Sequence, residues 1–357
     1  MLIHICCSVD SHYFLQKLRQ TLPNEPLIGY FYDPNIHPYS EYILRYNDVK
    51  RSCDKLGIDL IMGEYDYESW LSGTKGLENE PEKGKRCEYC FDFRVGNTAL
   101  KAKELGEKII TTTLLMSPKK DFTQLTNALK KAVCGTDIEI YAVDFRSGGG
   151  TNEQFELAKR DKLYHQNYCG CIFGLSKQRQ AQKLPLSELM SDAYARVLPG
   201  SIKERINLYD KVLQCEKNGQ KFDLKRSYFL NYRLFFAVVK RDKKAICSYI
   251  LSYSNFKRSG IKISIDENYH QNVNLRDGVI FIDISFYNKL TGCKFANVAE
   301  LNRANFDLKT ELNVRESLSG AMSQNPIIVL DEIVSGRYEI YAKNELYSDS
   351  REILITH

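Results

Sequence analysis

The sequence lacks long apolar runs. Its longest stretches, such as Leu234–Val239 and Ile327–Leu330, fall far short of the roughly 20 residues that a membrane-spanning helix needs. The opening residues Met1–Cys6 form an apolar, strand-like run, without the basic segment and cleavage site of a secretory signal. We therefore expect a cytoplasmic protein whose cysteines lie in a reducing compartment.

Two glycine-rich motifs are also missing. No G-x-x-x-x-G-K-[ST] and no G-x-G-x-x-G pattern occurs, which argues against a P-loop or a dinucleotide site. We find no internal repeat and no low-complexity tract. With 357 residues, of which 43% are hydrophobic and 11% aromatic, the chain can bury a sizeable core and is long enough for two domains.

Cysteine, by contrast, is plentiful. Six of the eleven cysteines fall into three close pairs: Cys6-Cys7, Cys87/Cys90 and Cys169/Cys171. In a reducing compartment such thiolates bind metals or do redox chemistry. The five unpaired cysteines are interpreted as packing residues: Cys53, Cys134, Cys215, Cys247 and Cys293.

Each pair taken alone has more than one interpretation. Cys6-Cys7 can be two buried strand cysteines, and Cys87-x-x-Cys90 fits zinc, an iron–sulfur cluster or a redox pair. Cys169-Gly-Cys171 can bind one metal or close a strained disulfide. Together with Asp10, six thiolates exceed the needs of a zinc site. Four would fit one [4Fe–4S] cluster and leave a dithiol for a second metal or for redox work.

The first half of the chain alternates between short strands and helices. We expect strands at Leu2–Cys6, Leu27–Tyr32, Asp59–Met62, Lys108–Thr113 and Ile138–Phe145. Helices are expected after a loop Cys7–Ser11 up to about Arg19, at Ser40–Leu56, Phe91–Leu105 and Phe122–Val133, and from Thr151, with Thr151 and Gln154 in capping-box spacing. This alternation predicts an α/β domain over residues 1–185, with a mostly parallel sheet that binds ligands at its carboxyl edge.

After Pro185 the pattern changes. Leu186–Tyr253 is predicted to be helical, and β-rich segments follow at Ile261–Ile265, Gly278–Phe286, Ile327–Val334 and Arg337–Tyr341, with Ser335-Gly336 as a hairpin turn. Residues 186–357 are therefore predicted to form a second, α+β domain.

A basic stretch opens this second half. From Lys203 to Arg258 there are 14 Lys and Arg against 5 Asp and Glu. Aromatic residues are interleaved with it: Tyr228, Phe229, Tyr232, Phe235, Phe236, Tyr249 and Tyr253. Such a mixture suits single-stranded nucleic acid. A solvated helix face with core aromatics is the competing interpretation.

Two further features each allow two interpretations. Arg146-Ser-Gly-Gly-Gly150 joins a strand to a helix, and is either a phosphate-binding turn or a flexible connection. His37 lies in the rigid turn Asp33–Pro38, as an acid, a substrate contact or a structural turn residue.

Taken together, the motifs of residues 1 to about 182 resemble those of the QueH-type epoxyqueuosine reductases. The matching elements are His4-Ile-Cys-Cys7, Asp33–Pro38, Arg86-Cys-Glu-Tyr-Cys90, Thr111–Lys120, and the run from Asp144 through Gln166-Asn-Tyr-Cys-Gly-Cys171. The part after Pro185 has no counterpart that we recognise in the shorter members.

The resemblance implies a Rossmann-like (HUP-type) fold and a tRNA-modifying oxidoreductase. Such enzymes remove the epoxide oxygen of epoxyqueuosine at the wobble position, using a [4Fe–4S] cluster and an additional mononuclear iron. Carried over, the cluster ligands are Cys6, Cys7, Cys87 and Cys90, and the redox or second-metal pair is Cys169 with Cys171. Asp10, a hard ligand, suits the second iron.

The resemblance also implies partners. These are tRNA carrying epoxyqueuosine, an unidentified electron donor, and neither membrane nor DNA. We expect the extension after Pro185 to contribute to tRNA binding. The alternatives are an ATP-dependent tRNA thiolation-type enzyme, for which Cys7-Ser-Val-Asp10 is an unsuitable phosphate loop, and a zinc-stabilised RNA-binding module.

Overall fold

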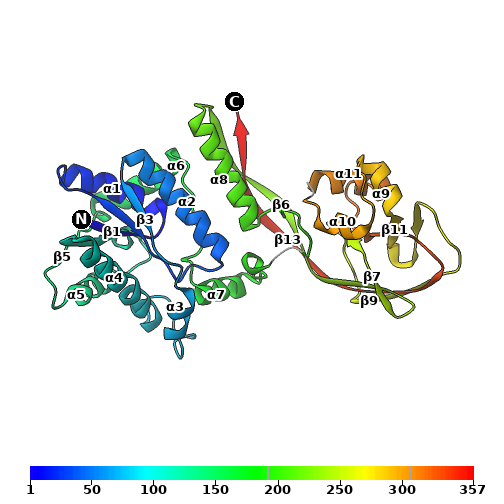
Figure 1. Ribbon diagram of the computed structural model, residues 1–357, viewed down its shortest axis with the longest axis horizontal. Helices are drawn as coiled ribbons and strands as arrows, with labels where there is room; N and C mark the ends of the chain where they lie inside the picture. The colour runs from blue at the N-terminus through cyan, green and yellow to red at the C-terminus, as the bar shows by residue number, and fades with distance from the viewer. Residues whose placement is uncertain (191–192, 306–307) are drawn as a thin grey trace. The chain divides into compact units, whose positions relative to one another are not determined.

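The chain forms two compact units (Figure 1). The computed structural model describes residues 1–190, 193–305 and 308–357. The first unit comprises Met1–Leu186, Ile206–Leu224 and Thr356–His357, and the second comprises Ser187–Arg205 and Lys225–Ile355. The first unit therefore takes up a segment from the second half of the chain, which contains most of helix α8 (Ile202–Lys217).

A five-stranded sheet forms the centre of the first unit. Its order is β3 (Asp59–Met62), β2 (Ile28–Phe31), β1 (Leu2–Ile5), β4 (Ile109–Thr112) and β5 (Glu139–Ile140). Every pairing is parallel, with Leu2 opposite Ile28 on one side and Ile110 on the other. All four residues of β1 are buried, as expected for a strand covered on both faces. The predicted Rossmann-like α/β fold is confirmed.

The connections between strands determine where a ligand can bind. Helices α1 (Ser8–Thr21) and α2 (Tyr39–Leu56) connect β1 to β2 and β2 to β3, whereas α4 (Lys85–Leu105) and α5 (Phe122–Val133) connect β3 to β4 and β4 to β5. Helix α1 packs on α2 and α6 (Gly150–Arg160), and α4 packs on α5. Because parallel crossovers are right-handed, the reversal of strand order at β1 puts these two sets on opposite faces. A crevice opens between β1 and β4 at their carboxyl ends.

Three predictions for this unit are wrong in detail. Helix α1 begins at Ser8, so the expected loop Cys7–Ser11 is its first turn. Helix α4 begins at Lys85 and therefore contains both Cys87 and Cys90. Strand β5 has only two residues, whereas a strand was expected across Ile138–Phe145. Two short helices near the carboxyl edge were not predicted: α3 (Tyr67–Gly73) and α7 (Ile172–Gln182).

The second unit contains strands from two four-stranded sheets. One sheet has the order β10 (Asn272–Asn274), β11 (Ile280–Asp283), β12 (Ile327–Leu330) and β8 (Tyr249–Ile250). Helices α9 (Ile284–Thr291), α10 (Val298–Arg303) and α11 (Leu308–Ser319) lie between β11 and β12 in the chain. The other sheet has the order β7 (Lys244–Ile246), β6 (Phe222–Arg241), β13 (Gly336–Thr356) and β9 (Gly260–Ile265). The predicted α+β character of this region is confirmed.

The helical prediction for Leu186–Tyr253 is wrong for most of its length. Only α8 is a long helix there, and Phe222–Arg241 is a strand of 20 residues. Its many aromatic and β-branched side chains favour a pleated strand over a helix. The predicted hairpin turn at Ser335-Gly336 is also wrong, because β12 and β13 belong to different sheets and Gly336 pairs with Ile265 of β9.

Hydrophobic packing supports each unit separately. The core of the first unit surrounds the central strands, with Phe14, Phe31 and Leu115 fully buried. In the second unit Phe281 and Ile328 lie in a separate cluster. Among the described residues we find no helix that combines the length and the apolar composition needed to span a bilayer.

One buried ion pair organises the second unit. Arg196 and Glu311 are 5% and 1% exposed, and their charged groups lie 2.8 Å apart. The Tyr249 hydroxyl group and the Ser252 backbone N–H both donate hydrogen bonds to the Glu311 carboxylate. Glu311 thus joins α11 to the segment that contains β8.

We expect Glu311→Ala to lower the free energy of unfolding by about 3–5 kcal/mol, because it leaves Arg196 buried without its counter-charge. Urea denaturation measures this loss. Glu316→Ala, an exposed position on the same helix, should change stability by less than about 0.5 kcal/mol. Equal effects of the two substitutions would contradict a role for the buried pair.

Candidate metal centre

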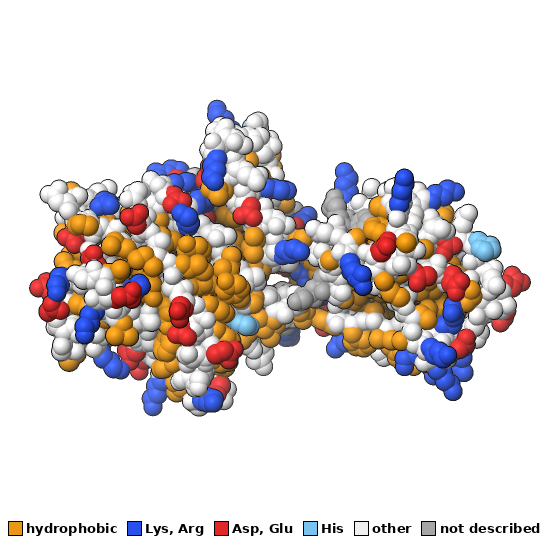
Figure 2. Space-filling view, in the orientation of Figure 1, with side chains coloured by type: hydrophobic (Ala, Val, Ile, Leu, Met, Phe, Trp, Pro, Cys, Tyr) orange, Lys and Arg blue, Asp and Glu red, His pale blue; other side chains and the backbone are white. Residues whose placement is uncertain are grey.

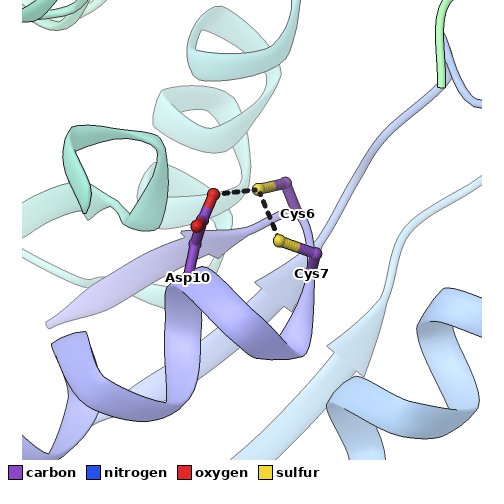
Figure 3. A group of neighbouring side chains, drawn as sticks. All are labelled: Cys6, Cys7 and Asp10. Atoms are coloured by element: carbon purple, nitrogen blue, oxygen red, sulfur yellow. Dashed lines mark hydrogen bonds between the residues drawn. The ribbon is translucent and has the colours of Figure 1, made fainter. Parts of the chain in front are cut away.

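Two cysteines and a carboxylate converge where β1 ends. Cys6 and Cys7 follow the last residue of the strand, and Asp10 lies in the first turn of α1 (Figure 3). The Cys6 Sγ lies 3.7 Å from the Cys7 Sγ and 4.0 Å from Asp10 Oδ2. The ligand atoms of all three residues lie within 4.8 Å of one another, so they could hold one metal ion. We call Cys6, Cys7 and Asp10 the strand-end triad.

A buried glutamine fixes the carboxylate of the triad. Gln154, in the first turns of α6, donates a hydrogen bond of 2.6 Å to Asp10 Oδ1. Burial raises the pKa of Asp10 to about 6, against the opposing effect of hydrogen bonds from Cys7 and Gln154. The predicted capping box of Thr151 and Gln154 is therefore wrong. Helix α6 is capped by Gly149, and the Gln154 side chain contacts the triad instead.

The second cysteine pair lies on α4. Cys87 and Cys90 are three residues apart on a helix, so their side chains share one face. The Lys83 backbone N–H donates to the Cys87 Sγ at 3.3 Å, which stabilises a thiolate there. Burial raises the pKa of Cys90, and the nearby Arg94 guanidinium group opposes that rise.

The third pair is held by the turn that follows β2. The His37 backbone N–H donates to the Gly170 carbonyl at 3.0 Å, and the Asn35 side chain donates to the Cys169 carbonyl at 3.3 Å. Gly170 has φ +100°, and a Cβ placed there would lie 2.7 Å from Ile36 Cγ1. Glycine is therefore required between Cys169 and Cys171, both by the left-handed backbone and by this close approach.

The same turn explains His37. Its ring stacks on Tyr67 with 4.5 Å between ring centroids, and its carbonyl accepts a hydrogen bond of 2.7 Å from Tyr168. Burial lowers the pKa of His37, partly opposed by Glu68. These contacts favour the structural interpretation of His37 over a role as an acid or substrate contact.

All three cysteine pairs line one cavity of about 670 Å³. Its wall includes Cys6, Cys7, Cys87, Cys90, Cys169 and Cys171, together with Asp10. Cys90, Cys169 and Cys171 are near enough to influence one another electrostatically, as are Cys87 and Cys90. We call Cys87, Cys90, Cys169 and Cys171 the four-cysteine group. Trp70 packs against Cys90 and Cys171, so one side of this group is shielded by an aromatic ring.

Two positive side chains counter the charge of the thiols. Arg94 pairs with buried Asp33 and lies near Cys90 and Cys6. Burial alone would lower the pKa of Lys120, but the thiols of the four-cysteine group outweigh burial and raise it. Cations at this distance favour the thiolate form, which is the form that binds metal.

The glycine-rich segment Arg146–Gly150 lies outside the lining of this cavity. The Arg146 side chain donates to the backbone carbonyls of Ser117 and Lys120, at 3.2 and 3.0 Å, and lies over the ring of Phe122. Arg146 thereby fixes the loop that carries Lys120 into the cavity wall. These contacts give the segment a structural task and do not support the phosphate-binding alternative.

Three residues near the metal centre were not selected from the sequence: Arg94, Lys120 and Gln154. Arg94 could have been found, because it follows Cys90 by four residues on a helix and so lies on the same face. Gln154 carried no such signal, since its contact with Asp10 spans 144 residues of sequence.

Known proteins similar to this chain belong to one family. A family model described as epoxyqueuosine reductase QueH matches residues 1–177. The epoxyqueuosine reductase QueH of Helicobacter pylori is 39% identical over 351 residues, which cover 93% of this chain and 94% of the relative. The similarity thus includes the region after Pro185.

Other relatives match only the first half. QueH of Histophilus somni is 36% identical over 54% of this chain and 82% of its own length, and QueH of Thermotoga maritima is 33% identical over 50% and 92%. Among solved structures, the U34-tRNA thiolase NcsA of Methanococcus maripaludis with its [4Fe-4S] cluster matches at a TM-score of 0.33 and 13% identity, covering 60% of this chain and 73% of its own. That likeness is too slight to bear on function.

We expect Gly170→Ala to lower the free energy of unfolding by about 1–3 kcal/mol, because alanine is strained at positive φ and its Cβ would press on Ile36. Urea denaturation measures the change. Gly96→Ala is the matched control, since it lies within α4 with no heavy atom within 4 Å of the added Cβ. It should be neutral or stabilising by up to about 1 kcal/mol. A neutral Gly170→Ala would contradict the close packing described here.

In metal-free protein we expect Cys169 to react with iodoacetamide faster than Cys171. A hydrogen bond from Cys171 and the nearby Lys120 hold the pKa of Cys169 well below its usual range, whereas the pKa of Cys171 is raised. Cys169 is therefore a thiolate at neutral pH, and its reactivity should fall only as the pH drops through that lowered pKa. Peptide mass spectrometry after brief alkylation at pH 7 measures the order. Preferential labelling of Cys171 would contradict this assignment.

Proposed function

The chain belongs to the QueH family of epoxyqueuosine reductases, and from this membership we propose that its cysteine-lined cavity reduces epoxyqueuosine in tRNA to queuosine. The reaction consumes two electrons and two protons. Both C–O bonds of the epoxide break, the two ring carbons form a double bond, and the oxygen leaves as water. The observation that carries the proposal is the convergence of six thiols and one carboxylate on a single cavity.

The ligand division expected from the sequence remains untested. It assigns the cluster to the first two cysteine pairs and leaves the third as a redox pair: Cys6, Cys7, Cys87 and Cys90 against Cys169 and Cys171. We propose a different division. The strand-end triad already brings three ligand atoms within 4.8 Å of one another, a set that suits one metal ion. The four-cysteine group then supplies the four thiolates that one [4Fe–4S] cluster requires.

The chemistry of the two donor sets fits this division. A carboxylate is a hard ligand, and two thiolates beside it suit iron. Four thiolates with compensating cations nearby suit an iron–sulfur cluster, whose potential depends on charge and hydrogen bonds around the sulfurs. When bound, the cluster supplies single electrons and the separate iron supplies Lewis acidity toward the epoxide oxygen.

The chain's own residues bind, orient and protonate. Gln154 holds Asp10 in one orientation through the bond to Oδ1, leaving Oδ2 toward Cys6. Lys120 lines the cavity with its ammonium group kept protonated by the surrounding thiols. We assign to Lys120 Nζ the donation of a hydrogen bond to the departing oxygen. Trp70 and Phe91 contribute apolar wall and reduce the access of water.

The partner that follows from this function is tRNA carrying epoxyqueuosine. The base must leave the anticodon stack to enter the cavity, as in other enzymes that modify bases. The electron donor is unidentified. The similarity to epoxyqueuosine reductases gives no support to a thiolation-type enzyme or a zinc-stabilised module.

Anaerobically purified protein should contain about five iron and four sulfide per chain. Asp10→Ala should lose about one iron and keep the sulfide, whereas Cys169→Ala should lose the cluster and its visible absorption. Both should lower kcat by about a hundredfold or more on epoxyqueuosine-containing tRNA, as loss of a group acting in the transition state does. Iron and sulfide assays with nucleoside mass spectrometry measure these outcomes.

Cys134→Ala serves as the control, because Cys134 is exposed and lies outside the cavity lining. It should leave metal content and activity unchanged. A Cys169→Ala protein that kept all its sulfide would refute the proposed division and favour the redox-pair assignment. Zinc in place of iron would refute the function.

A further inference from the structure

One face of the second unit's long-stranded sheet combines positive and aromatic side chains. In the central part of β13 the even-numbered residues Tyr338, Ile340 and Ala342 are buried in the core, so the odd-numbered residues point to the opposite face. The same alternation in β9 buries Ile261, Ile263 and Ile265. The outer face therefore carries the remaining residues of these strands, together with Phe236, Val238 and Lys240 of β6.

Cations from three neighbouring strands meet on this face. They are Lys240 of β6, Lys262 of β9, and Arg337 and Lys343 of β13. Lys262 lies directly opposite Glu339 in the β9–β13 pairing, and Lys240, Lys262 and Arg337 all act on that carboxylate. Four cations thus surround one acid. We call this set, with its aromatic neighbours, the basic sheet face.

Aromatic rings lie between the cations. The Lys240 ammonium group lies 5.4 Å from the centroid of the Tyr341 ring, and Lys343 lies 5.7 Å from that of Phe235. Phe236 is 47% exposed and Val238 is 39% exposed. Figure 2 shows hydrophobic and basic side chains next to one another along the lower edge of the second unit, where Figure 1 draws strands β7 and β9.

We propose that the basic sheet face binds the tRNA substrate. This inference rests on the proposed function for the identity of the RNA, and goes beyond it by naming a binding surface outside the metal centre. The cations attract the phosphate backbone, and the exposed ring of Phe236 offers a stacking platform for an unpaired base. Pleated sheets with exposed aromatics are a common surface for recognising single-stranded RNA.

The charge of the face favours RNA over a second copy of the chain. Two copies that met through this face would bring eight cations together against two carboxylates, and like charges in an interface are costly. An RNA backbone supplies the missing negative charge. The structure also separates the aromatics of the basic stretch, since Phe236 is exposed whereas Tyr232 and Tyr249 are buried in the core.

The test uses full-length protein and an unmodified transcript of the substrate tRNA. We expect Lys240→Ala/Lys343→Ala to raise the Kd about tenfold at moderate salt and to reduce the slope of log K against log salt by about 1.4–1.8, as loss of two phosphate contacts does. Fluorescence anisotropy at several salt concentrations measures both values. Phe236→Ala should raise the Kd by about fivefold to a hundredfold, with the salt slope unchanged.

Matched controls lie elsewhere on the same unit. Lys289→Ala/Lys294→Ala removes two exposed cations near or on α9, and Leu312→Ala removes an exposed apolar side chain on α11. These variants should bind like the wild type. In turnover assays the basic-face variants should raise KM and leave kcat at saturating tRNA unchanged, because the metal centre is intact.

The outcomes distinguish this inference from the proposed function. Unchanged Kd and salt slope in the Lys240→Ala/Lys343→Ala protein would overturn the binding surface even if the wild type reduces epoxyqueuosine. The same result combined with conversion of a dimer to a monomer in light scattering would identify the face as a contact between copies and also overturn it. Reduced tRNA affinity in a wild-type protein that lacks reductase activity would support the surface and refute the proposed function.

Discussion

The hydrogen bond between the His37 N–H and the Gly170 carbonyl ties the last cysteine pair to the sheet. Cys169 and Cys171 lie in an irregular segment that precedes α7, and no strand carries them. Their position depends on the turn after β2, which grips the backbone on both sides of the glycine. The contact of Gly170 with Ile36 leaves no space for a side chain. The cavity therefore requires glycine at this position.

Charge balance is the second requirement of the cavity. Several thiolates within one buried wall would repel one another, and burial alone disfavours their charged form. Arg94 and Lys120 supply opposing charge from two different faces of the sheet edge, and each is fixed by a partner of its own. Arg94 pairs with Asp33, and Arg146 binds the loop that carries Lys120. The segments that looked like phosphate or substrate contacts thus support the geometry around the thiols.

Much of this was predictable from sequence because it is local. Strand β3, helix α2 and helix α5 follow from apolar periodicity and from clear stop signals such as Gly57, which ends α2 at φ 60°. The cysteine pairs and Asp10 were recognised from residue type and spacing. Long-range contacts were not predictable, and the bond from Gln154 to Asp10 is the clearest case. The strand Phe222–Arg241 was taken for helix because its pairing partners lie far away in the chain.

The central claim is that the cysteine-lined cavity of the first unit reduces the epoxide of epoxyqueuosine. The most direct measurement is anaerobic incubation of the iron- and sulfide-loaded protein with epoxyqueuosine-containing tRNA and a chemical reductant, followed by mass spectrometry of the wobble nucleoside. We predict that the nucleoside loses the mass of one oxygen atom, and that protein lacking the cluster leaves it unchanged. Fully loaded protein that leaves the nucleoside mass unchanged, or protein that removes the oxygen without its cluster, would contradict the account.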